Sequence, residues 1–280
     1  MQNENIKNTI LQKTEEIPPI PQILPVLLKL IDRKNPPIQS IQDIIMTKDV
    51  EMSRKIKELK EKGLSTYNII TDTVFILSLT TLKNLIFTPK FLKESSAKEM
   101  SAFKITQNEL WNHSRMVAIT SKIIAQEINF YPVEIAFVTG LFHDQGRIIL
   151  NVYGKSEIDK IIKLTKAKAY TLYNLEDQVF GFNHSYLGAR IARKWGLPSY
   201  IVEAINYHHD PHMATERQKL VEIVHLADGL ISSYQTHLPL KNLFFPIDQL
   251  VLSNITIEES RLYELAKASE EYFEKLKQMV

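Results

Sequence analysis

Histidine and aspartate side chains of metal-ligand type are concentrated in the middle and second half of the chain. Imidazole nitrogen and carboxylate oxygen together suit Fe, Mn, Zn, Co or Ni better than a soft metal. The chain has no cysteine, so any metal must bind through His, Asp or Glu. Four imidazoles and two carboxylates are enough for one ion or two. The predicted metal ligands are His113, His143, Asp144, His184, His208 and Asp228.

The spacing of apolar residues places two of these ligands on inward faces of helices. Asp228 lies seven, four and three residues from Val221, Val224 and Ile231, which share one helical face. His113 extends, by one turn, the apolar stripe that follows it. A carboxylate on a buried face costs several kcal/mol unless a cation, a metal or hydrogen-bond donors offset that cost. Asp228 therefore requires a partner.

Two further histidines fall on inward faces by the same argument. His208 lies seven residues after Ile201, and His184 lies seven residues before Ile191. The pair His143-Asp144 follows the apolar run 135–142. Adjacent residues cannot share one helix face, but at a helix end both side chains can reach one ion. Gly146 would supply the backbone freedom for that end.

Each of these residues also has a purely structural interpretation. His113 alone could be a core histidine bonded to a carbonyl, His184 could be a helix-terminal residue without a role, and Asp228 could pair with Arg147 or Lys83. Metal binding is favoured only because six such residues fall on inward positions of consecutive helices. The other histidines are predicted to be surface or supporting groups: His209, His212, His225 and His237.

The elements that must position these residues are predicted to be helices. The chain has only 8 glycines, and its apolar residues recur at spacings of three and four. A first helical pattern, 23–31, follows Pro21, and shorter ones span 41–46 and 51–62. Residues 74–86 form one buried helix or two short ones. The sequence therefore predicts an all-α fold.

The later breaks delimit at least five helices after Glu109. The segment 258–279 has a narrow apolar stripe, which favours a packed terminal helix over a partner-binding element. Residues 90–107 form a polar connection. The predicted organisation is a helical N-terminal lobe (1–107) packed on a helical bundle with the His/Asp pocket (108–237), followed by a helical extension (238–280).

Composition restricts the functional classes. The 280 residues carry a formal net charge of +2, which gives no bulk field for nucleic acid or an anionic membrane. The lack of cysteine removes disulfides and thiol nucleophiles. The sequence has no signal peptide pattern and no apolar run of membrane-spanning length. We expect a cytoplasmic protein with no nucleic-acid or membrane partner.

The pattern of an early His, an adjacent His-Asp, later single histidines and a final Asp resembles the HD superfamily of metal-dependent phosphohydrolases. More specifically, the chain resembles the HDOD domain family from Ile17 to about Tyr234. Upstream resemblances lie in 17–22, 40–45, 48–55 and 79–87, and downstream ones in 111–114, 140–147, 183–189, 195–198, 207–209 and 225–228.

The resemblance implies an all-α fold and a role in bacterial signal transduction, mostly without enzymatic activity. It places metal ligands at the six positions above, with His209 as the alternative to His208. A regulatory module would act through a protein partner or a bound nucleotide or phosphate. The alternative is a metal-dependent phosphohydrolase acting on a nucleotide or phosphodiester, in which Asp144 bridges two ions and Arg147 neutralises a phosphate. These two would be the catalytic residues.

Three departures from the family pattern are visible. Gln145 stands where the family usually has an apolar residue, and Arg147 stands where Lys is common. Neither departure changes a ligand. The segment 55–65 lacks the family's usual run of small residues, which puts a family-like interface there in doubt.

Overall fold

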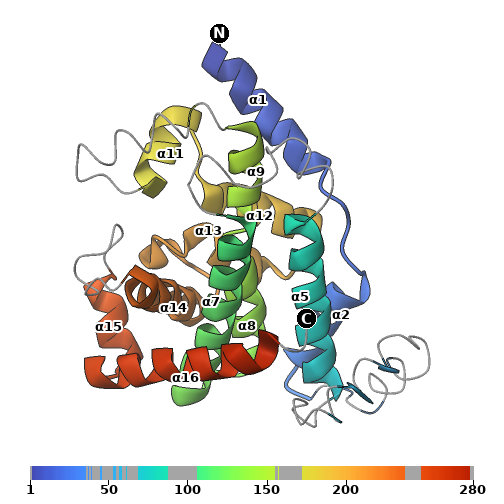
Figure 1. Ribbon diagram of the computed structural model, residues 1–280, viewed down its shortest axis with the longest axis vertical. Helices are drawn as coiled ribbons and strands as arrows, with labels where there is room; N and C mark the ends of the chain where they lie inside the picture. Colours follow the sequence, from blue (N-terminus) through green and yellow to red (C-terminus); the bar gives the residue numbers. More distant parts are fainter. Residues whose placement is uncertain are drawn as a thin grey trace.

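The computed structural model describes residues 2–35, 69–87, 106–154, 172–236 and 247–277, together with Glu157 and single residues between 37 and 61. The described residues contain helices and no strand, as the sequence predicts. Two helices form the centre (Figure 1). They are α7 (Gln107–Glu127) and α8 (Val133–Phe142).

α7 and α8 pack against each other more extensively than any other pair of elements. α7 begins with a capping box, in which Thr106 and Glu109 satisfy each other's backbone N–H groups. Every residue of α8 except Glu134 is buried. A helix that is apolar on all sides belongs at the centre of a core, and α8 occupies that place.

Two N-terminal helices cover one side of this pair. α2 (Ile23–Ile31) packs on α5 (Ile69–Ile86), and α5 packs on α8 and α7. The rings of Phe75 and Phe137 lie 4.2 Å apart across the contact between α5 and α8. α5 is a single helix that begins before Asp72. The helices predicted at 41–46 and 51–62 lie outside the described residues, apart from single positions.

The first helix of the chain comes earlier than predicted. α1 (Gln2–Glu15) precedes the proline-rich segment after which the first helical pattern was placed, so that prediction was wrong. This helix contributes few side chains to the apolar core, but its Ile10 is fully buried. α1 packs on α9 (Gly146–Tyr153), α11 (Leu172–Phe180) and α12 (His184–Lys194). The sequence pattern missed it because this helix is stabilised by tertiary contacts rather than by a broad apolar face.

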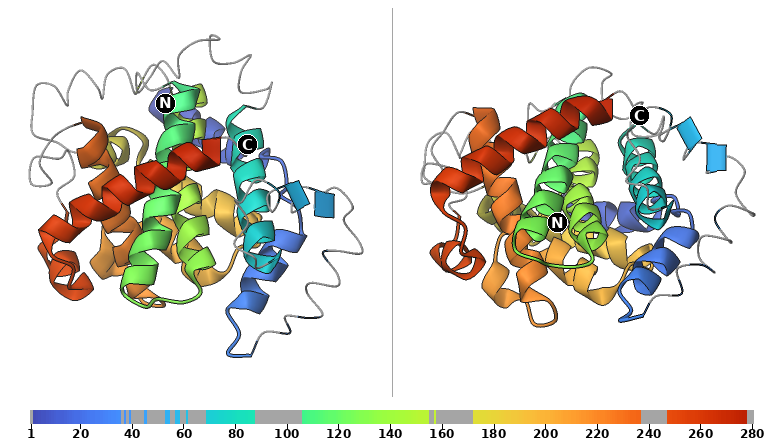
Figure 2. Two further views of the ribbon diagram at one scale, coloured as in Figure 1. Left: turned by 60° about the horizontal axis from the view of Figure 1, so that its bottom comes forward. Right: turned by 90° about the horizontal axis from the view of Figure 1, so that it is seen from below.

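The other side of the bundle is formed by α13 (Ser199–Tyr207), the short η1 (Pro211–Met213) and α14 (Gln218–Thr236). α15 (Gln249–Ile255) packs on α14, and α16 (Glu259–Lys277) crosses α7 obliquely (Figure 2). The last helix is therefore packed on the bundle. Buried apolar side chains from Ile10 to Phe273 form one cluster, while the three-part division of the chain stays a prediction.

Candidate metal centre

His143 and Asp144 lie at the junction between α8 and α9. His143 caps α8, and α9 begins at Gly146. Nδ1 of His143 is 2.7 Å from the carbonyl oxygen of Gly140, so it donates there and Nε2 faces the interior. The carboxylate of Asp144 lies 3.6 Å from that Nε2. The helix end therefore brings both side chains close together in the interior.

Gly146 is required for a different reason from the one predicted. It is a helical residue and is not among the glycines with positive φ, so backbone freedom was the wrong explanation. A Cβ atom at Gly146 would lie 2.0 Å from the carbonyl oxygen of His184. The missing side chain lets the start of α9 touch the start of α12. This contact places Nε2 of His184 3.2 Å from Oδ1 of Asp144.

His184 is oriented by Glu176 of α11, a residue that sequence reasoning did not identify. Oε2 of Glu176 lies 2.8 Å from the backbone nitrogen of His184 and 2.6 Å from its Nδ1. Both side chains are fully buried. Because Nδ1 is held by the carboxylate, Nε2 is the nitrogen available to the cluster. The available signal was the spacing of four residues between Glu176 and the buried Phe180.

His208 is positioned by two backbone hydrogen bonds at the end of α13. Its Nδ1 lies 2.7 Å from the carbonyl oxygen of Ile205, which turns Nε2 inward. Its own carbonyl oxygen accepts a hydrogen bond of 2.7 Å from Nδ1 of His225. Nε2 of His225 in turn accepts the backbone N–H of Asp248 at 3.0 Å. His225 is thus a supporting residue behind a predicted ligand.

His209 joins the cluster beside His208 instead of replacing it. Its Nε2 lies 3.0 Å from Nε2 of His184. Two ring nitrogens at this distance are spaced like neighbouring ligands of one ion, whose bonds to nitrogen are about 2.0–2.1 Å long. The choice between His208 and His209 that the sequence left open does not arise, since both lie at the site.

Asp228 receives its hydrogen bond from His113. Nε2 of His113 lies 3.0 Å from Oδ1 of Asp228 and 3.9 Å from Oδ2 of Asp144. Nε2 of His143 lies 3.7 Å from the same Oδ1. Neither Arg147 nor Lys83 is needed to explain the buried carboxylate. Arg147 instead places its Nε 2.7 Å from Oδ1 of Asp144.

All six predicted ligands, and His209, meet in one buried cluster. Their ligand atoms form three groups in which all members lie within 4.8 Å of one another. These groups are His113/His143/Asp228, His143/Asp144/His208 and His184/His208/His209.

Two observations test whether this cluster fits a divalent ion. Nε2 of His143 and Nε2 of His208 are buried and make no hydrogen bond to any described residue. Buried polar atoms normally have partners, so these two nitrogens lack the interaction that an ion would supply. The donors are imidazole and carboxylate only, a set that suits Zn, Mn, Fe, Co or Ni. The residues of the cluster therefore fit a divalent metal ion.

Electrostatics hold the cluster in the protonation states that metal binding needs. Burial lowers the pKa of His208 to about 3, and burial also lowers the pKa values of His143 and His209. Burial alone would raise the pKa of the Asp144 carboxyl, but Arg147 and the surrounding histidines keep it well below its usual range. Burial acts in the same direction on Asp228, yet the hydrogen bond from His113 and the charges nearby lower its pKa to about 2.

Two histidines that were predicted to be surface or supporting groups remain, His212 and His237. His212 is a surface group whose side chain is 60% exposed, 3.6 Å from Asp248. His237 lies outside the described residues.

The model of the HDOD domain family matches residues 17–211. The chain belongs to the HDOD domain family. An uncharacterised protein of Treponema pallidum (strain Nichols) is 22% identical over 98% of this chain, which spans about half (53%) of that relative's length.

Solved structures of HDOD and related proteins share the fold. An HDOD domain protein of unknown function from Geobacter sulfurreducens has a TM-score of 0.58 at 21% identity, covering 98% of this chain and 93% of its own. A candidate phosphohydrolase of Shewanella amazonensis has a TM-score of 0.63 at 19% identity, with coverages of 97% and 98%. A candidate signal transduction protein of Marinobacter aquaeolei has a TM-score of 0.65 at 14% identity, with coverages of 96% and 60%. At these identities the likeness shows the fold alone.

None of the described helices combines the length and the apolar character needed to cross a membrane.

Proposed function

We propose that this chain is a cytoplasmic bacterial signal-transduction module whose buried His/Asp cluster binds one or two divalent ions. The observation that carries the proposal is the convergence of every predicted ligand around the Nε2 atoms of His143 and His208, which make no hydrogen bond within the described part of the chain. The ligands come from α7, the α8–α9 junction, the start of α12, the end of α13 and α14. A bound ion therefore ties together helices that are far apart in sequence, and its binding free energy stabilises their arrangement.

The closure of the site supports a regulatory role over hydrolysis. The side chains of His143 and His184 are fully buried, and those of Asp144 and Asp228 are 5% and 4% exposed. His113 and Arg147, at 16% and 12%, and the partly buried His209 reach the surface. A phosphoester substrate needs direct access to the ion. A signalling module needs only that the ion fix one arrangement of helices, which a protein partner can then recognise.

The test is the metal content per chain, measured by plasma mass spectrometry on protein purified without chelator or nickel resin. We expect one or two ions in the wild type and loss of metal in Asp144→Ala, with retained helicity by circular dichroism. Glu264→Gln, which alters an exposed carboxylate of α16, is the control and keeps its metal. A folded, metal-free wild type would overturn the proposal.

A second candidate, a metal-dependent phosphohydrolase, is favoured by one specific observation. Two of the ligand groups, His113/His143/Asp228 and His184/His208/His209, share no residue, and Asp144 approaches His113, His143 and His184. When bound, divalent ions polarise a phosphoryl oxygen and activate water. In this chain Asp144 would be a ligand of both ions. Arg147 would keep the carboxylate of Asp144 ionised. Hydrolysis of bis(p-nitrophenyl) phosphate by the metal-loaded wild type, abolished in Asp144→Ala, would establish this activity; inactivity with Mn²⁺, Zn²⁺, Fe²⁺, Co²⁺ and Ni²⁺ would exclude it for that substrate.

A further inference from the structure

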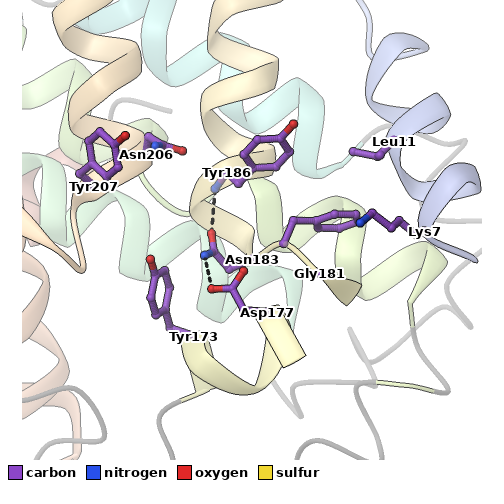
Figure 3. A pocket seen from close by; sticks show the side chains of 10 residues that line it. Lys7, Leu11, Tyr173, Asp177, Gly181, Asn183, Tyr186, Asn206 and Tyr207 are labelled. Atoms are coloured by element: carbon purple, nitrogen blue, oxygen red, sulfur yellow. Dashed lines mark hydrogen bonds between the residues drawn. The ribbon is translucent and has the colours of Figure 1, made fainter. Parts of the chain in front are cut away.

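A second cavity lies beside the His/Asp cluster, between α1, α11, α12 and α13. It has a volume of about 340 Å³ and is open to solvent at one side. That volume falls in the range of small-molecule sites, which start at about 300 Å³. Its walls come from segments far apart in the sequence: Lys7 and Leu11 of α1 face residues of α12 and α13 (Figure 3). The packing of α1 on the bundle therefore forms one wall of the cavity.

The lining favours a ligand with a planar ring. Four aromatic residues contribute to the walls: Tyr173, Phe182, Tyr186 and Tyr207. The rings of Phe182 and Tyr186 stack on each other at 6.0 Å, and Tyr186 is 42% exposed. Exposed aromatic faces of this kind stack with heterocyclic bases, because every base has a π-face.

The polar groups of the cavity are arranged along one direction. Figure 3 shows Asn206 and Tyr207 on one side and Lys7 on the other, with Asp177 and Asn183 between them. The carboxamide of Asn206 makes no hydrogen bond to any described residue, whereas one oxygen of Asp177 accepts a hydrogen bond of 2.9 Å from Asn183. Nζ of Lys7 lies 5.9 Å from the centre of the Phe182 ring at the far end.

Each polar group matches one part of a mononucleotide. An asparagine carboxamide pairs bidentately with the N6 and N7 edge of adenine, which offers one donor and one acceptor. A carboxylate such as that of Asp177 accepts hydrogen bonds from ribose hydroxyls. An ammonium such as that of Lys7 binds phosphate as a point charge. The geometry points to an adenine mononucleotide in this cavity, with the base at Asn206, the ribose at Asp177 and the phosphate at Lys7.

Two residues connect this cavity to the metal cluster. The ring of Tyr173 lines the cavity and lies 5.1 Å from the ring of His209, and its hydroxyl donates to Asp210 at 2.6 Å. Asn183 also lines the cavity and caps α12 by accepting the backbone N–H of Tyr186 at 2.9 Å. The residue after this cap is His184. A nucleotide that fixes Tyr173 and Asn183 therefore changes the affinity of the cluster for metal, and this part of the inference rests on the proposed function.

The first experiment titrates the full-length protein with AMP by isothermal calorimetry. We expect saturable binding, with Lys7→Ala and Asn206→Ala each weakening it about tenfold, because each removes one specific polar contact. Adenosine, which lacks the phosphate, should bind Lys7→Ala and wild type equally. Lys267→Ala, which removes an exposed lysine of α16, is the charge-matched control and binds AMP like the wild type.

The second experiment measures the apparent affinity for Mn²⁺ with and without saturating AMP. We expect AMP to change the apparent affinity for Mn²⁺ about fivefold in the wild type. In Lys7→Ala the same AMP concentration should leave that affinity unchanged. The absence of AMP binding at millimolar concentration, or equal binding by wild type and both cavity variants, would overturn the nucleotide site. AMP binding with unchanged Mn²⁺ affinity would overturn the coupling alone. If the chain binds no metal, the first experiment still decides the nucleotide site, so the two failures are distinguishable.

Discussion

Asp228 shows how single residues create the charge state of the cluster. Its carboxylate is nearly inaccessible to solvent, and burial alone would favour the protonated form. The hydrogen bond from His113 at 3.0 Å and the charges of neighbouring histidines reverse that preference and lower its pKa to about 2. An unfolded aspartate titrates near pH 3.9. The carboxylate therefore contributes stability above that pH, and the contribution is lost as pH falls through the folded pKa.

This linkage predicts a pH-dependent difference between wild type and Asp228→Asn. At pH 6 the wild type should be more stable by about 3 kcal/mol, from a shift of about two pH units at 1.36 kcal/mol each. The difference should narrow below about pH 4, because the wild-type carboxylate then becomes protonated in the unfolded state first. Urea unfolding of metal-free protein between pH 6 and pH 3 measures it. A difference that stays constant over this range would contradict the linkage.

Glu176 shows which site residues the sequence could not supply. Four of the six predicted ligands could be found because each continues an apolar stripe of its own helix, and His143 and Asp144 because the pair directly follows an apolar run. Glu176 acts on His184 from a different helix, and His209, which the sequence offered only in place of His208, enters the site through the end of α13. Their roles depend on how α11 and α13 dock, which spacing within one helix does not encode. The sequence placed His225 among the surface or supporting groups but could not give its contact with the His208 carbonyl, for the same reason.

Removing the carboxylate of Glu176 should weaken metal binding without removing a ligand. In Glu176→Ala, His184 loses the acceptor of its Nδ1–H and of its backbone N–H, so its Nε2 is no longer held toward the cluster. Loss of such a supporting group lowers metal affinity by about 10–100-fold. Competition with a chromophoric chelator measures the affinity, and Glu203→Ala, which alters a carboxylate on the outer side of α13, serves as control. Equal affinities for both variants would show that Glu176 does not position His184.

The contact between the helices α9 and α12 depends on the absence of a side chain at Gly146. Gly146→Ala brings a Cβ atom to 2.0 Å from the carbonyl oxygen of His184, where backbone must move. We expect a loss of more than about 2 kcal/mol in the free energy of unfolding, as for other overpacked sites. Gly196→Ala is the comparison: its φ is +72° but nothing lies within 4 Å, so only backbone strain of about 1 kcal/mol opposes it. Chemical denaturation measures the loss in the free energy of unfolding for each variant. A smaller loss for Gly146→Ala than for Gly196→Ala would contradict the prediction.

The last helix is attached to α7 through a buried cation. The guanidinium of Arg115 lies 4.7 Å from the ring centres of both Trp111 and Phe273, and burial lowers its pKa to about 10. Arg115→Ala removes the contact with Phe273 of α16 and the contact with Trp111 within α7, and should cost about 2 kcal/mol, including lost packing of the side-chain stem. Arg261→Ala breaks two exposed ion pairs, with Glu127 and with Glu264, so we expect a smaller change in stability. Thermal unfolding of the two variants measures both, and a larger effect of Arg261→Ala would contradict this assignment.

Helix prediction succeeded or failed according to where each helix obtains its stability. α8 could be predicted because its own sequence is apolar throughout, and α14 because its stripe repeats over several turns. α1 could not, since its attachment comes from other elements. Nε1 of Trp195 donates to the carbonyl oxygen of Pro18 at 3.0 Å, and Arg190 pairs with Glu15 at 2.6 Å. These partners are more than 170 residues away in sequence, so no local pattern records them.

For the whole molecule, the cluster is the point at which helices from separate parts of the sequence meet. An ion that binds only the folded chain stabilises it by RT ln(1 + [L]/Kd), about 2.7 kcal/mol at a hundredfold excess over Kd. Mn²⁺ or Zn²⁺ should therefore raise the melting temperature of metal-free wild type, and EDTA should reverse the rise. His208→Ala should melt without a metal-dependent shift, because its inward Nε2 is lost, whereas His212→Ala, on the surface, should shift like the wild type. Differential scanning calorimetry of the three proteins decides the matter: equal shifts in all of them would place the bound ion outside the cluster, and no shift in any would leave the five helical elements held together by packing alone.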